Sequence, residues 1–122
     1  NATGNLVWQK TIGGASHDMA YSGTASPDSG FVLSGTTNSN NSGDVGTTRG
    51  QLDLWVVKVT ANGTLAGQLL MGGNIDDWGI GIIPVPYGYV ITGASRSNNS
   101  GDVGANHGNA DMWLVKIKEP AL

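Results

Sequence analysis

The sequence contains an eight-residue stretch that occurs twice without change. Residues 39–46 and residues 97–104 both read Ser-Asn-Asn-Ser-Gly-Asp-Val-Gly, at an offset of 58 positions. An identity of this length does not arise by chance in a chain of 122 residues. Internal repeats with periods of this order are typical of proteins that stack copies of one small structural unit. This repeat therefore restricts the fold more than any other feature of the sequence.

Alignment of the two halves extends the similarity over almost the whole chain. The offset is 59 before residue 27 and 58 after residue 30, because the second copy lacks one turn residue. Positions that match across the two copies include Gln9 with Gln68, Gly13-Gly14 with Gly72-Gly73, Asp18 with Asp77, Asp53 with Asp111 and Trp55-Val56-Val57-Lys58 with Trp113-Leu114-Val115-Lys116. We therefore predict two tandem units, residues 1–62 and residues 63–122, that share one core.

Each unit is predicted to contain four strands and no helix. The expected strands are residues 6–12, 19–25, 31–36 and 54–60, and in the second unit residues 65–71, 78–83, 89–94 and 112–118. The last two strands of each unit are apolar at consecutive positions, and successive strand residues face opposite sides, so these sheets should be covered on both faces. Trp55 and Trp113 lie in such runs and are expected in the core. The fold class predicted is all-β, with two tandem four-stranded antiparallel blades like those of a β-propeller.

The motifs taken together resemble a family of repeats in bacterial and archaeal cell-surface propeller proteins. The residues that carry the resemblance are Gly4-Asn5-Leu6-Val7-Trp8-Gln9-Lys10, Gly13-Gly14, Asp18, residues 28–36, the Gly-Asp-Val loop and Asp53-Leu54-Trp55-Val56-Val57-Lys58. The second unit departs from this pattern at Gly67 and Leu69, where the first unit has Trp8 and Lys10. The resemblance implies a non-catalytic extracellular or cell-surface protein, and it carries over no catalytic residue.

Composition and charge exclude several kinds of partner. The net charge is −3 with only six Lys and Arg residues, so a nucleic-acid partner is not expected. No apolar run reaches 18 residues, and we therefore expect no membrane span. The chain has no cysteine, which excludes disulfides and thiolate metal sites within it. Ser16, His17 and Asp18 are contiguous and their side chains diverge, so they cannot form a catalytic triad, and we expect no enzyme activity.

The repeated polar loops carry the candidate ligands. Their carboxylate and amide oxygens could bind a hard cation such as Ca²⁺, with the candidate ligands Asn40, Asp44, Asp53, Asn98, Asp102 and Asp111. Alternatively, these side chains hydrogen-bond the backbone of their own loops, or they contact a sugar or a partner protein. Four N-x-Ser/Thr sequons give the candidate glycosylation sites Asn1, Asn40, Asn62 and Asn98.

Two functions from different classes fit this architecture. Two units leave two outer faces uncovered, and repeat proteins normally need about three or more units to bury their core. The first hypothesis is thus a structural protein whose copies assemble head to tail into a filament, tube or ring. Exchange of residues 6–12 or 112–118 between copies could also complete a neighbouring sheet. The second hypothesis is a lectin-like carbohydrate-binding or adhesion module that binds glycans between its blades.

Overall fold

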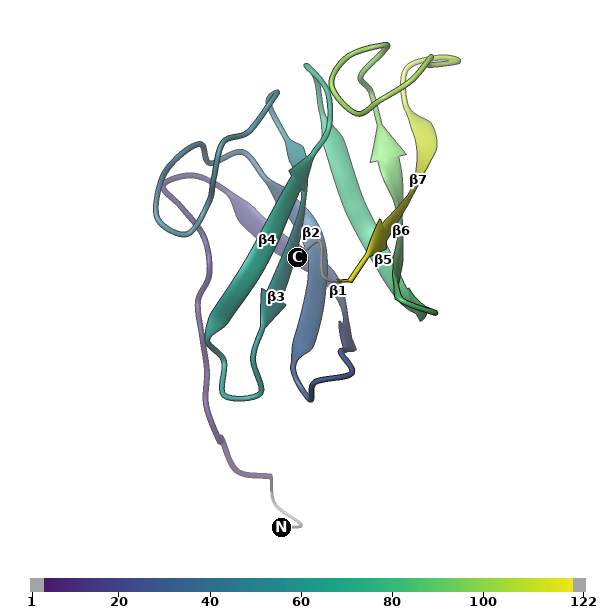
Figure 1. Cartoon of the computed structure of the whole chain (residues 1–122). Coiled ribbons are helices and arrows are strands. Elements are labelled where there is room, and N and C mark those ends of the chain that lie inside the picture. Colours follow the sequence, from purple (N-terminus) through teal and green to yellow (C-terminus); the bar gives the residue numbers. More distant parts are fainter. Residues whose placement is uncertain (1–3, 120–122) are drawn as a thin grey trace.

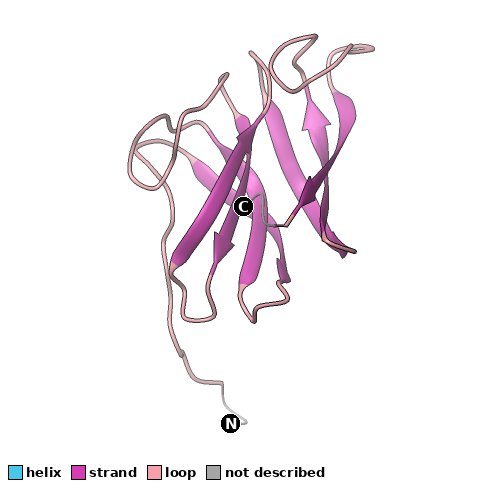
Figure 2. Ribbon diagram, viewed as in Figure 1, coloured by secondary structure: helices cyan, strands magenta, loops and turns pink. Residues whose placement is uncertain are grey.

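The computed structural model describes residues 4–119, which form two antiparallel β-sheets joined by turns and loops (Figures 1 and 2). The first sheet contains, in this spatial order, β1 (Asp18–Ala25), β2 (Phe31–Thr37), β3 (Asp53–Val59) and β4 (Leu65–Met71). The second contains β5 (Asp77–Val85), β6 (Gly88–Ser95) and β7 (Asp111–Lys118). The expected all-β class with antiparallel sheets is confirmed, although the two sheets of one chain do not close into a propeller. Within residues 4–119 no helix is long and apolar enough to span a bilayer.

The strand pairing differs from the prediction at the start of each unit. Residues 6–12 form no strand, so the prediction of a strand there was wrong for the single chain. Strand β4 forms where expected, but it pairs with β3 and thus completes the sheet of the first unit. Because β4 lies beside β3 at the edge of the first sheet, this edge is not free for residues 6–12. The second sheet consequently has three strands instead of four.

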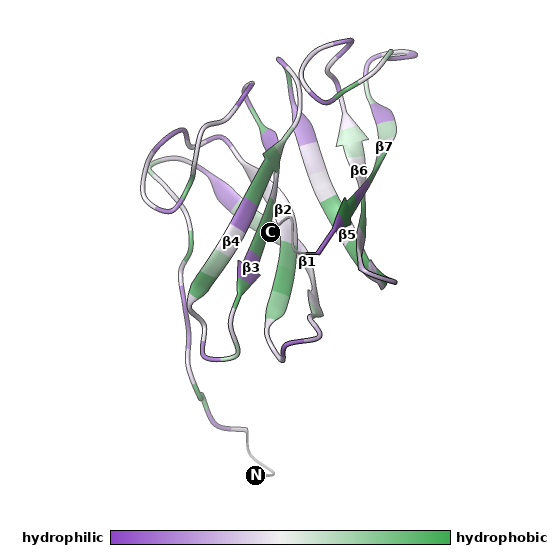
Figure 3. Cartoon of the chain, in the orientation of Figure 1, coloured by the Kyte–Doolittle hydropathy of each residue, from purple (hydrophilic) through white to green (hydrophobic). Residues whose placement is uncertain are grey.

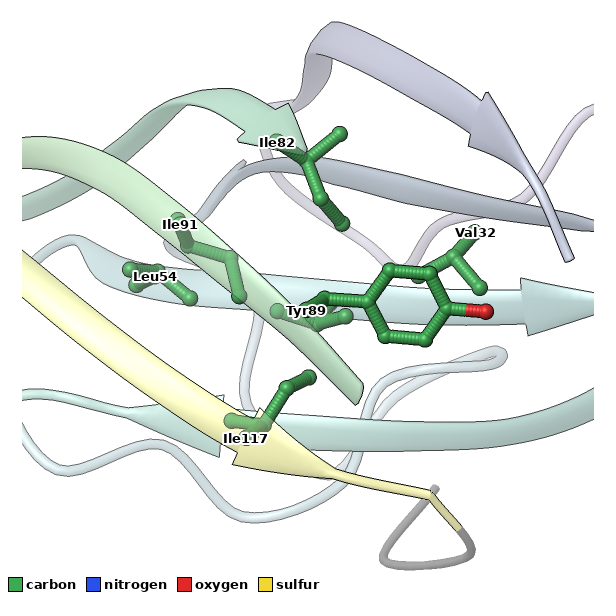
Figure 4. Close-up of a cluster of buried hydrophobic side chains, with 7 residues drawn as sticks. Val32, Leu54, Ile82, Tyr89, Ile91 and Ile117 are labelled. Carbon is green, nitrogen blue, oxygen red and sulfur yellow. The ribbon is translucent and has the colours of Figure 1, made fainter. Parts of the chain in front are cut away.

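The core lies between the two sheets, which pack face to face. Figure 4 shows side chains of the first sheet meeting those of the second, and the buried members of this cluster are Val32, Leu54, Val56, Ile82, Tyr89, Ile91 and Ile117. A second cluster covers the opposite face of the first sheet, where Val45, Trp55, Val57 and Val59 are buried against Ile12, Leu33, Leu65 and Leu70. Strand β3 is therefore covered on both sides, as its continuous apolar run predicts.

The two faces of each sheet can be named by their residues. The front face of the first sheet carries Val32, Leu54 and Val56, and its rear face carries Leu33, Trp55, Val57 and Val59. By the repeat offset of 58, the front face of the second sheet carries Val90, Met112 and Leu114, and its rear face carries Ile91, Trp113, Val115 and Ile117. The rear face of the second sheet packs on the front face of the first. The two units are thus stacked head to tail.

Candidate functional site

The front face of the second sheet is exposed although its counterpart is the centre of the core. Leu54 and Val56 are 0% exposed, whereas the residues at the matching positions, Met112 and Leu114, are 97% and 70% exposed. Figure 3 shows apolar stretches in green along β7, and the exposed side chains project from this strand. Met112 and Leu114 are therefore apolar residues at positions that are exposed to water in the single chain.

The rear face of the first sheet carries a small apolar pocket. Its volume is about 60 Å³, and its lining includes Ile12, Ala20, Leu33, Trp55 and Val57. The matching positions of the second sheet contact the front face of the first sheet, so this pocket lies where a further front face would sit. One chain therefore presents a rear face with a small pocket at one end of its stack and a front face with exposed apolar side chains at the other.

Each Gly-Gly turn is hydrogen-bonded to the polar loop of its own unit, which follows it in the sequence. In the first unit, the Gly13 amide donates to Asp44 Oδ2 over 3.0 Å, and the Asp44 amide donates to the Gly13 carbonyl over 2.9 Å. In the second unit, Gly72 and Asp102 make the same two hydrogen bonds, both over 3.0 Å. Arg49 also forms an ion pair with Asp102. Both repeated aspartates thus fasten a turn to a loop.

Asp18 and Asp77 make a second set of matching contacts, which the sequence analysis did not assign. Asp18 Oδ2 accepts a hydrogen bond from the Gly14 amide over 2.9 Å, and Asp18 Oδ1 accepts one from the Thr37 hydroxyl over 2.5 Å. Asp77 accepts the corresponding bonds from Gly73 and Ser95 over 2.9 and 2.5 Å. The signal that would have revealed this role is the recurrence of a hydroxyl residue at the position of Thr37 in both units.

The remaining candidate calcium ligands also accept backbone hydrogen bonds within their loops. The Asn40 and Asn98 side-chain oxygens accept from backbone amides eight residues further on, over 3.0 and 2.8 Å. Asp53 Oδ2 and Asp111 Oδ2 each accept a backbone amide hydrogen bond over 2.5 Å, from Arg49 and His107. Across the described part of the chain, no three acidic, His or Cys side chains gather in a group that could hold a metal ion. Asn40, Asn98, Asp53 and Asp111 thus bond the backbone of their own loops, whereas Asp44 and Asp102 bond the Gly-Gly turns, and the calcium site stays a prediction.

Asp53 lies in the contact between the two sheets, where it is fully buried together with Asp77. A side chain at Gly72 would lie 2.6 Å from Asp77 Oδ2 and 2.9 Å from Asp53 Oδ1, so only glycine leaves room for both carboxylates. Burial raises the pKa of the Asp53 carboxyl above its ordinary value of 3.8, the Arg49 amide opposes this shift, and the charge of Asp77 adds to it. The Asp53 carboxyl therefore binds its proton more tightly in the folded chain than in water.

Three of the four sequon asparagines lie in the described part of the chain. Asn40, Asn62 and Asn98 are exposed, as a glycosylated residue must be, whereas Asn1 lies outside the described residues. No protein-family model matches the chain, and no curated protein matches it. The resemblance to cell-surface repeats stays a prediction from the motifs, and the functional interpretation rests on the geometry of the sheet faces.

Proposed function

We propose that this protein is a non-catalytic structural protein of the cell surface or extracellular space, whose copies assemble head to tail. The observation that carries the proposal is the contrast between Leu54 and Val56, which are fully buried, and Met112 and Leu114, which are almost fully or largely exposed. A second copy that packs the rear face of its first sheet on these residues would repeat a contact that already exists within the chain. The extracellular location rests on the resemblance to surface repeats.

The contact within the chain supplies a template for the contact between copies. Leu54 packs against Gly79, where a Cβ would lie only 2.9 Å from Leu54 Cγ. The repeat offsets map Leu54 onto Met112 and Gly79 onto Ala20. We therefore expect Met112 to enter the pocket beside Ala20 in the next copy. The flexible methionine side chain can adapt to the additional methyl group at this position.

The size of the exposed side chains supports a stable contact. Full burial of a Met or Leu side chain contributes roughly 1.5–3 kcal/mol, and Met112 and Leu114 have 97% and 70% of their surfaces available for burial. Because the two faces of the contact differ, a bound copy presents a new front face and the assembly propagates. The product is a ring if the rotation between copies closes, and a filament or tube if it does not.

The proposal is tested by sedimentation velocity and negative-stain electron microscopy of the native chain and of Leu114→Asp. We expect the native chain to form rings, filaments or tubes, and Leu114→Asp to remain monomeric because it would bury an unpaired charge. The matched control is Tyr87→Asp, which replaces an 87% exposed aromatic residue in the β5–β6 turn, away from both faces. A monomeric native chain, or equal assembly of all three proteins, would refute the proposal.

A further inference from the structure

We propose that residues 6–12 of one chain form the fourth strand of the second sheet in a neighbouring copy, antiparallel to β7. This inference rests on the proposed self-assembly and specifies which segment joins the copies and in which register. It is drawn from the way in which β4 joins the two units of a single chain. The repeat counterpart of β4 is residues 6–12, and the counterpart of its partner β3 is β7.

Strand β4 shows how the chain passes from one sheet to the next. The strand itself pairs with β3 in the first sheet, whereas Gly72, directly after it, is hydrogen-bonded to Asp102 in the loop of the second sheet. Residues 6–12 also precede a Gly-Gly turn that is bound to the loop of its own unit, through Gly13 and Asp44. The strand before such a turn belongs to the preceding sheet, and within residues 4–119 no sheet precedes residues 6–12.

The segment starts on the side of the first sheet that faces away from β7 of the same chain. Ile12 packs against the rear-face cluster of the first sheet, while the second sheet covers its front face. In Figure 1 the segment runs down the side of the first sheet that is remote from β5, β6 and β7. The second sheet that stacks on this rear face comes from another copy, and its β7 is the edge that the segment can reach.

In the second sheet, no described strand pairs with the outer edge of β7, which is the position that corresponds to β4 in the first sheet. In the first sheet, Leu70 of β4 approaches the position of a Cβ on Gly46 to 3.3 Å, and Gln68 approaches it to 3.8 Å. The matching Gly104 has no atom within 4 Å of the corresponding point. A cavity of about 180 Å³ opens there, lined among others by Val103 and Trp113. This cavity is where residues of a fourth strand would lie.

Gln68 makes a set of hydrogen bonds that Gln9 is placed to repeat. The Gln68 side-chain oxygen accepts a hydrogen bond from Trp55 Nε1 over 3.0 Å and one from the Gly46 amide over 3.2 Å. Its side-chain nitrogen donates to the Asp44 carbonyl over 2.6 Å. The corresponding groups of the second unit are Trp113, Gly104 and Asp102, and Gln9 is identical to Gln68 at the matching position. In the single chain, Gln9 is exposed.

The pairing of β3 with β4 fixes the register between copies. Val57 faces Gln68 and Val56 faces Leu69, which predicts that Val115 faces Gln9 and that Leu114 faces Lys10. The donor segment also exposes Leu6 and Val7 in the single chain, at 80% and 88% of their surfaces. Donation would pair its backbone with an open sheet edge, which is the usual basis of strand addition between chains.

Disulfide cross-linking between two singly substituted proteins tests this register, because the chain contains no cysteine of its own. The Lys10→Cys protein is mixed with the Leu114→Cys protein under mild oxidation, and the two proteins carry different tags. Directly opposed Cα atoms in an antiparallel pair lie roughly 4.5–5.5 Å apart, a distance that a disulfide spans. The matched control mixes Lys10→Cys with Lys118→Cys, four residues further along β7 and roughly 13 Å away. We expect a cross-linked heterodimer only in the first mixture.

The possible results separate this inference from the proposed function. If the mixed Lys10→Cys and Leu114→Cys proteins assemble under reducing conditions but form no cross-link on oxidation, strand donation is refuted and face stacking stays intact. A monomeric native chain would refute both. Equal cross-linking in the two mixtures would refute the register. In a chain that carries both Lys10→Cys and Leu114→Cys, a cross-link within single molecules at high dilution would refute donation to a second copy.

Gln9→Ala provides a second readout that does not depend on oxidation. We expect it to raise the concentration for half-assembly about tenfold, because three hydrogen bonds to the neighbouring copy are lost. The urea midpoint of the dissociated chain should not change, since Gln9 is exposed there. Gln51→Ala, at another exposed glutamine, is the control. Assembly of Gln9→Ala that equals that of Gln51→Ala would refute the assigned contact.

Discussion

Alanine at the matching positions Leu54 and Met112 should have opposite effects on folding and assembly. Leu54 is 0% exposed, so Leu54→Ala should lower the free energy of unfolding by about 2–5 kcal/mol through lost burial and a cavity. Met112 is 97% exposed, so Met112→Ala should change the unfolding of the dissociated chain by less than about 0.5 kcal/mol. Its side chain contributes roughly 2 kcal/mol to the contact between copies, and its loss should weaken association about 30-fold.

Two assays on the same proteins distinguish these effects. Urea unfolding at a concentration below assembly measures the fold of the single chain, and light scattering as a function of concentration measures association. We expect Leu54→Ala to lower the urea midpoint strongly and Met112→Ala to raise the concentration for half-assembly without changing that midpoint. The reasoning would be refuted if Met112→Ala destabilised the dissociated chain as much as Leu54→Ala, or if it assembled like the native protein.

Three further predictions concern the interior of the chain. Trp55→Ala should lower the free energy of unfolding by roughly 3–5 kcal/mol, and Trp113→Ala by less, because Trp55 is buried and Trp113 only partly buried. Urea unfolding measures both changes, and equal losses of stability would contradict this prediction. Gln68→Ala should cost about 1–3 kcal/mol because it leaves the Trp55 Nε1 group without its acceptor, and an unchanged urea midpoint would argue against this hydrogen bond. The raised pKa of Asp53 means that the folded state binds its proton more tightly, so this contribution to stability is complete below about pH 3.8 and is lost as pH rises through the raised pKa. Asp53→Asn should therefore gain stability relative to the native protein as pH rises from about 3.8 through the raised pKa, and a difference that is constant with pH would contradict the assigned shift.

The repeat and the strand patterns predicted most of the fold. The apolar runs around Trp55 and Trp113 predicted strands β3 and β7, and the run in β3 predicted its coverage on both faces. The same expectation was wrong for β7, whose residues Met112 and Leu114 are exposed in the single chain. The pattern at residues 65–71 correctly predicted a strand but not its partner. Alternation and β-propensity describe a single strand, whereas the choice of edge depends on the spatial arrangement of both sheets. Residues 6–12 were predicted as a strand in the same way, yet they form no strand in the single chain.

The contacts of the candidate site were less predictable. Asp44 and Asp102 could be recognised as loop residues with oxygen ligands, but composition alone does not distinguish a cation site from hydrogen bonds within the loop. Their contacts with Gly13 and Gly72 depend on two backbone segments that cross in space. The match between Gln9 and Gln68 was visible in the alignment, yet its meaning required the position of Trp55.

Static light scattering of the native chain over a dilution series measures directly whether copies of the chain associate. We expect a weight-average mass well above 12.5 kDa at micromolar concentration, which falls on dilution as copies dissociate. The pocket on the rear face and the exposed apolar front face are present in every copy, so the association should not depend on any added ligand. A monodisperse species of 12.5 kDa over the whole series would contradict assembly through either the sheet faces or the donated strand.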